Sequence, residues 1–98
     1  MGANAVHIAV LVVDLHIPGA QSLKAKRRVI KSLKDRIRAK FNVSVAELDA
    51  LDKWQRSICG ITMIGNDQPF LDRCMQQTIT LIETIGELQI LDTKIEFL

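Results

Sequence analysis

Residues 22–40 constrain the fold of this chain most, because they have the period of a helix with two unlike sides. Ser22 can accept a hydrogen bond from the first turn and so begin this helix. At 100° per residue, one arc of about 100° is apolar. Its members are Val29, Ile30, Leu33 and Ile37. A helix with such a stripe is expected to cover a hydrophobic core.

The same segment concentrates positive charge. It holds nine of the 13 Lys and Arg residues and one acid, Asp35, for a formal charge of +8. The rest of the chain carries −6, so the net charge of +2 conceals a strongly dipolar molecule. Six of the cations fall within an arc of about 120° opposite the apolar stripe. They are Lys24, Arg27, Arg28, Lys31, Lys34 and Arg38. A basic face of this kind is typical of proteins that bind polyanions.

Strand patterns surround this helix. Residues 5–17, 41–48, 54–64 and 88–97 are rich in β-branched or alternating apolar residues, which favours four strands. In the first strand the odd positions are expected to face the core, since Asp14 and His16 belong to the even set. In the last strand the expected inward residues are Leu91, Ile95 and Phe97.

A second helix is predicted between the last two strands. Asp67 can cap it, Pro69 suits its first turn and Gly86 is placed to end it. Seven residues have the spacing of one inward face. They are Phe70, Leu71, Cys74, Met75, Thr78, Ile82 and Ile85.

The order β-α-β-β-α-β predicts a single α+β domain over residues 1–98. Two helices on one face of a four-stranded antiparallel sheet form the ferredoxin-like arrangement. Right-handed crossovers would place the first and third strands at the centre. The other sheet face would stay open, and an exposed apolar patch there favours a homodimer. The expected interface residues are Val10, Val12, Ile58 and Ile64.

Several classes of protein do not fit the composition. The longest apolar run, Ile8 to Val13, is far shorter than the roughly 20 residues that span a membrane. The first residues lack the pattern of a secretory signal. The two cysteines, Cys59 and Cys74, are expected to be buried thiols. We therefore expect a cytoplasmic protein without a membrane partner.

Catalytic patterns are weak, and we predict no catalytic residues, metal or cofactor. Asp14 and His16 share a strand face and could orient each other or share a metal, although a metal site needs more ligands. The carboxylates of Glu47, Asp49 and Asp52 could hold Mg²⁺, but solvation in a loop is the favoured explanation. Glu47 could instead pair with Arg56 across a hairpin.

Four motifs resemble one known family. They are Ser22-Leu23-Lys24-x-Lys26-Arg27, the segment 41–47 (FNVSVAE), Trp54-Gln55-Arg56 and Gly65-Asn66-Asp67. In this order and spacing they are similar to the bacterial YlxP-like family, from about Val6 to Leu98. Ala25 departs from the Glu common in relatives. The family is a domain of unknown function with a ferredoxin-like fold, encoded among translation and ribosome-maturation genes. The resemblance thus implies a small factor associated with RNA or the ribosome.

Together these features predict a non-enzymatic protein that binds RNA phosphates through the six cations of the first helix. Trp54 and Arg56 are further candidates, because an aromatic beside a cation can stack on an unpaired base. Trp54 could also pack on the sheet edge or in a dimer contact. Two other classes remain open: a dimeric ligand-sensing regulatory domain, and a metal-dependent enzyme that uses Asp14 and His16.

Overall fold

The alternating apolar residues near the start of the chain form a central strand. The computed structural model describes residues 5–98, and β1 spans His7–His16. Leu11, Val13 and Leu15 are completely buried, whereas Val12 and Asp14 between them are half-buried on the other side. The predicted inward parity of β1 is therefore confirmed.

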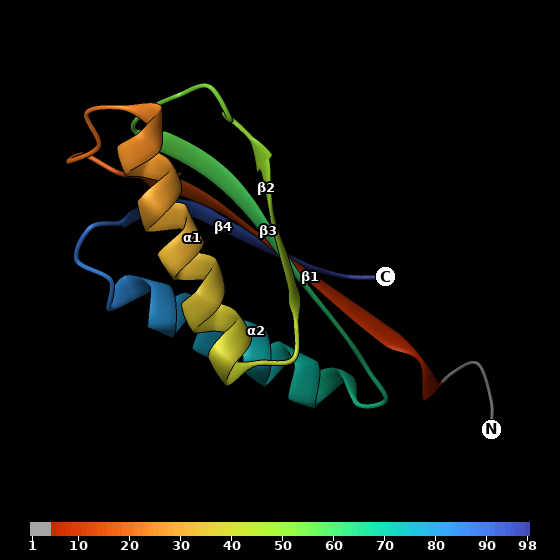
Figure 1. Cartoon of the computed structure of the whole chain (residues 1–98). Helices are drawn as coiled ribbons and strands as arrows, with labels where there is room; N and C mark the ends of the chain where they lie inside the picture. Colours follow the sequence, from red (N-terminus) through yellow and green to blue (C-terminus); the bar gives the residue numbers. More distant parts are fainter. Residues whose placement is uncertain (1–4) are drawn as a thin grey trace.

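The elements follow one another in the predicted order (Figure 1). They are β1, α1 (Leu23–Lys40), β2 (Ser44–Asp49), β3 (Arg56–Gly65), α2 (Gln68–Glu83) and β4 (Gln89–Phe97). The sheet has the order β2-β3-β1-β4, and all neighbours are antiparallel. Both helices cover one face (Figure 1). The ferredoxin-like α+β fold, with the first and third strands at the centre, is confirmed.

The core lies between the sheet and the apolar sides of the two helices. Ile30, Leu33 and Ile37 of α1 are buried, as the stripe predicts. From α2, Leu71 and Met75 join the same cluster. The Ser22 hydroxyl caps α1 by accepting a hydrogen bond from the Ala25 N–H at 3.0 Å. The orientation of α1, with its basic side outward, thus follows from burial of the opposite side.

Two strands begin later than the pattern predicts. Phe41 ends α1 instead of starting β2, because its N–H donates to the Ile37 carbonyl at 2.9 Å. Its ring is buried in the core cluster. Trp54 lies in the loop before β3, which begins at Arg56. These two aromatic residues fit a strand composition but serve as a cap and a loop residue.

Two predictions of inward residues are wrong, and the predicted cap of α2 is confirmed in its position only. Phe70 lies at the border of the α2 stripe and is exposed, with its ring beside the Arg73 guanidinium at 5.9 Å. Leu91 is exposed because a β-bulge shifts the register between β1 and β4, so that Ile90 pairs with Leu15. Asp67 begins α2 through its backbone, and its carboxylate makes no cap hydrogen bond.

Candidate nucleic-acid interface

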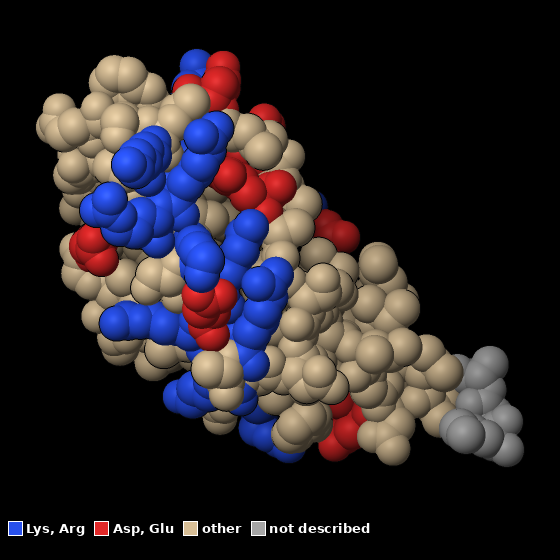
Figure 2. All heavy atoms as spheres, viewed as in Figure 1, with Lys and Arg blue, Asp and Glu red and all other residues tan. Residues whose placement is uncertain are grey.

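The six predicted cations lie on the outward side of α1. Five of them are exposed, and Lys34 is half-buried. Arg36 and Lys40 on the same helix are exposed as well. Figure 2 shows Lys and Arg side chains gathered in a band over α1. We call the side chains of Lys24, Arg27, Arg28, Lys31, Lys34 and Arg38 the basic face.

Two members of the basic face already have partners. Lys31 pairs with Asp35 one turn away at 2.9 Å, and both side chains are exposed. Arg38 donates to the Val45 carbonyl on the edge strand β2 at 3.1 Å. Within residues 5–98 the other four cations have no carboxylate within 4.0 Å. The basic face therefore retains most of its charge.

A shallow groove runs beside the basic face, between α1 and β2. Its cationic lining consists of Arg27, Lys31, Lys34 and Arg38. Two carboxylates also line it: Asp35, which pairs with Lys31, and Glu47 from β2. The side chain of Glu47 is mostly buried, and its charge is balanced by a lysine beneath the groove. A backbone that carries phosphates can thus approach the groove without meeting an unbalanced acid.

That lysine is Lys26. Its position differs most from the prediction that the charge of residues 22–40 lies on the outward side of the helix. Although it belongs to the basic segment, it is completely buried on the core side of α1. Its Nζ donates to Glu47 Oε2 at 3.0 Å, the Ala50 carbonyl at 2.8 Å and the Leu51 carbonyl at 3.2 Å. A fourth acceptor, the Arg56 carbonyl, lies at 3.3 Å. A buried ammonium needs such partners, since burial without them is costly.

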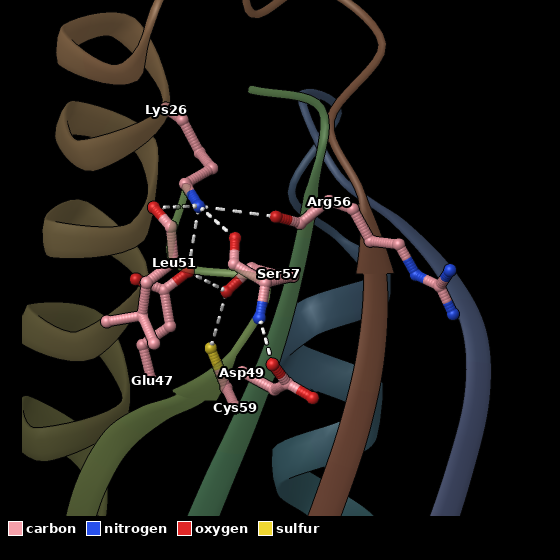
Figure 3. Close-up of polar contacts among 8 residues, drawn as sticks. Lys26, Glu47, Asp49, Leu51, Arg56, Ser57 and Cys59 are labelled. Atoms are coloured by element: carbon pink, nitrogen blue, oxygen red, sulfur yellow. Dashed lines mark hydrogen bonds and ion pairs between the residues drawn. The ribbon is translucent and has the colours of Figure 1, made fainter. Parts of the chain in front are cut away.

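The network continues from Glu47 into the sheet (Figure 3). The Ser57 hydroxyl donates to Glu47 Oε2 at 2.6 Å and lies 3.4 Å from Cys59 Sγ. Burial raises the pKa of the Cys59 thiol, and the hydrogen bond with Ser57 opposes this only in part. Cys59 and Cys74 are both buried free thiols, as predicted. Cys59 is therefore a packed thiol without the marks of a nucleophile.

The sequence contains a signal for Lys26 that charge counting misses. Lys26, Ile30, Leu33 and Ile37 follow the spacing i, i+4, i+7 and i+11, which places the lysine in the middle of the apolar stripe. A charged residue at such a position requires a buried partner. The partner comes from β2, and only the fold brings Glu47 beneath the first turns of α1.

Arg56 lies away from the basic face. Its side chain points away from Lys26 (Figure 3) and holds Asp14 on the open face of the sheet. Nε and Nη2 donate to the two Asp14 oxygens at 3.0 and 2.6 Å. The hydrogen bond from Arg56 keeps the pKa of Asp14 below its usual range. The predicted pairing of Glu47 with Arg56 is wrong, because these side chains lie on opposite faces of the sheet.

The candidate metal ligands are also engaged elsewhere. His16 Nδ1 lies 3.1 Å from Gln89 Oε1, while Asp14 is held by Arg56. The Asp49 carboxylate accepts from the Ala50 N–H at 2.7 Å. In the described part of the chain, no three His, Cys, Asp or Glu side chains gather as a metal site would require.

The open face of the sheet has an apolar centre. Val10, Val12 and Ile58 are half-buried there, and Ile64 is exposed. Leu48 lies in the irregular register between β2 and β3, and its side chain packs over Gly60. A Cβ on Gly60 would come within 2.7 Å of Leu48 Cδ1, so this glycine makes room for the leucine.

No helix within residues 5–98 has the length and apolar character to span a membrane.

Comparison with known proteins agrees with this fold. Over residues 8–95 the chain matches the family described as "Protein of unknown function (DUF503)". It is 33% identical over 78 residues to "Uncharacterized protein YlxP" of Bacillus subtilis (strain 168), covering 80% of this chain and 85% of that protein. A solved structure, "De novo designed protein Foldit4", is similar with a TM-score of 0.55 at 13% identity. The superposition covers 94% of this chain and 96% of the designed protein, and it supports the fold alone. The chain therefore belongs to the YlxP-like DUF503 family, whose function is unknown.

Proposed function

We propose that this protein is a small non-enzymatic factor that binds RNA, as part of the ribosome or during its maturation in the cytoplasm. The supporting observation is the basic face, with Lys24, Arg27, Arg28 and Lys34 free of carboxylates in the described part of the chain. Phosphates would replace the counterions around these side chains, and release of those ions would drive binding.

The geometry favours RNA backbone over specific bases. The helix is about 27 Å long, and its cations follow one side of it. A single basic helix surface suits the phosphates that flank a groove of duplex RNA, which proteins recognise largely by shape. The whole of α1 contains no Asn or Gln to read base edges and no aromatic residue to stack on a base.

A matched pair of variants tests this function. Arg27→Glu/Arg28→Glu reverses two cations of the basic face, and Arg73→Glu/Lys94→Glu makes the same change of net charge elsewhere. We expect the first pair to abolish binding to a labelled RNA duplex of about 20 base pairs, measured by fluorescence anisotropy. The second pair should bind nearly as tightly as the wild type. Equal losses in both would mean that only net charge matters, and the proposal would be wrong.

The open face is a second proposed contact surface, for another copy of this chain. Ile64 is the most exposed of the four predicted interface residues, at 67%, and the other three are half-buried along the same face of β1 and β3. An exposed apolar area on an otherwise polar protein often marks an interface. Such a dimer would leave both basic faces accessible, since α1 covers the opposite side of the sheet.

The two alternative classes receive less support. Asp14 and His16, the ligands of the proposed metal-dependent enzyme, are bound by Arg56 and Gln89. A ligand-sensing domain would use a pocket at the dimer interface, and its only support is analogy with other proteins of this fold.

A further inference from the structure

The loop between β2 and β3 presents two large apolar side chains to solvent. Trp54 is 53% exposed and Leu51 58% exposed, although both residue types favour burial. The loop covers residues 50–55. Trp54 is also the one tryptophan of the chain. The basic face alone gives this loop no role.

The backbone of the loop is fixed at both ends. Lys26 Nζ binds the carbonyls of Ala50 and Leu51 at its start and that of Arg56 at its end. Gln55 adds two bonds, since its carbonyl accepts from Ile17 at 2.9 Å and its side chain donates to Ala20 at 3.1 Å. Ordering before binding lowers the entropy lost when a ligand is held.

The fixed loop lies at the same end of the molecule as the start of the basic face (Figure 1). Lys26 reaches the loop from the core side of α1, whereas Lys24 and Arg28 lie on the outward side. The charges of Asp52 and Lys53 within the loop balance each other. An RNA that continues past the first turn of α1 would therefore reach the loop that carries Trp54.

We propose that Trp54 stacks on an unpaired base of an RNA whose phosphates lie on the basic face, and that Lys26 is the positioning residue that holds Trp54 there. The proposal rests on the function proposed above and narrows its substrate to a duplex interrupted by a bulged or single-stranded nucleotide. An indole ring stacks on any base, because every base has a π-face. This makes Trp54 a sensor of an unpaired base without a sequence code.

Two RNAs that differ by one nucleotide test the proposal. One is a blunt duplex of about 20 base pairs, and the other contains a single unpaired adenosine in its middle. We expect the wild type to bind the bulged RNA about tenfold more tightly, from one stacked base. The fluorescence of Trp54 should fall when the bulged RNA binds and change little with the blunt duplex.

Matched lysine variants separate positioning from charge. Lys26→Met should remove the preference for the bulged RNA, and the unbalanced Glu47 that it leaves should weaken binding to both RNAs alike. Lys24→Met should weaken binding to both RNAs equally and make the salt dependence less steep. Trp54→Ala should also remove the preference for the bulged RNA. Addition of Lys26→Met to this variant should not change that preference further. Gln55→Ala removes one hydrogen bond of the loop and is the replacement for Lys26→Met if that variant does not fold. It should lower the preference for the bulged RNA.

Each alternative result has a distinct meaning. Equal affinity of the wild type for both RNAs, or a preference that survives Trp54→Ala, overturns the role of Trp54. A change in Trp54 fluorescence with protein concentration alone would place this residue in a contact between copies and also overturn it. Loss of RNA binding in Arg27→Glu/Arg28→Glu with no effect of Trp54→Ala would leave the basic face as the whole interface.

Discussion

At the scale of single residues, two lysines of one helix turn have opposite environments. Lys24 is exposed on the basic face, whereas Lys26 is completely buried with four oxygen acceptors around Nζ. Burial of a charge is tolerated when its hydrogen bonds are complete. The importance of Lys26 is therefore structural first, because it joins α1, β2 and the loop between β2 and β3.

Lys26→Met is expected to lower the free energy of unfolding by about 2–4 kcal/mol, because it leaves Glu47 without its partner. Lys24→Met should change this free energy by no more than about 0.5 kcal/mol. Urea denaturation of both variants measures the difference. A Lys26→Met variant as stable as the wild type would show that the buried network contributes nothing net.

The pair of Arg56 and Asp14 should make stability depend on pH. Because Arg56 lowers the pKa of Asp14 in the folded protein, the pair stabilises the fold above the ordinary aspartate pKa of about 4. This contribution is lost as the pH falls through the lowered pKa. Arg56→Gln should thus be less stable than the wild type at pH 7, and the difference should shrink below about pH 4. Thermal unfolding across this pH range measures it. A difference that stays constant from pH 7 to pH 3 would contradict the assignment.

Residue partners were only partly predictable. Helical spacing alone places Lys26 in the apolar stripe, so its burial could have been found. The partner of Arg56 depends on strand register, since Arg56 lies opposite His16 and reaches diagonally to Asp14. The sequence gives the face of each strand residue, but the neighbour on that face is set by how the strands align.

At the scale of elements, α1 carries a cost in stability. Several members of the basic face lie three or four residues apart, where like charges repel by about 0.2–0.5 kcal/mol per pair. Asp35 relieves this only around Lys31. The first turn of α1 contains no acid, although an acid there would be favourable. A helix that retains this repulsion between like charges is consistent with selection for binding over stability.

Lys24→Glu tests this interpretation. It removes repulsion with Arg27 and Arg28, adds attraction to both and places an acid near the helix N-terminus. We expect the unfolding free energy to rise by about 1 kcal/mol at low salt and by less at high salt. The affinity for RNA should fall in the same variant.

Lys24→Gln is the control, since it removes the charge without reversing it. Its stability should lie between those of the wild type and Lys24→Glu. A destabilised Lys24→Glu variant at low salt would mean that repulsion within α1 is not significant.

Elements were more predictable than their ends. The order of strands and helices follows from the change between alternating and helical spacing, which depends only on local sequence. The late start of β2 at Ser44, the position of Trp54 in a loop and the bulge that exposes Leu91 were not predicted. These depend on caps and on the register between strands, which involve contacts distant in the sequence.

At the scale of the whole molecule, two surfaces with different chemistry lie on opposite sides of the sheet. The basic face covers the outside of α1 (Figure 2), and the open face of the sheet presents Val10, Val12 and Ile58, with Ile64 exposed near one end of β3. This arrangement allows RNA binding and self-association to occur together. A dimer through the open face would double the number of basic faces in one particle.

The dimer is tested by light scattering coupled to size-exclusion chromatography at micromolar concentration. We expect the wild type to elute as a dimer and Ile64→Lys as a monomer, because the substitution places a charge at the most exposed apolar residue of the proposed interface. Phe70→Lys, a matched change at an exposed apolar residue of α2, should remain a dimer. A monomeric wild type would exclude this contact.

The most direct test of RNA binding is its dependence on salt. Four cations of the basic face have no carboxylate partner among residues 5–98; together with Lys31 and Arg38 they correspond to about four to six phosphate contacts. A plot of log K against log salt for an RNA duplex should therefore have a slope of about −3 to −5. A flat plot, or no binding at low salt, would contradict the proposal that the basic face of α1 binds RNA.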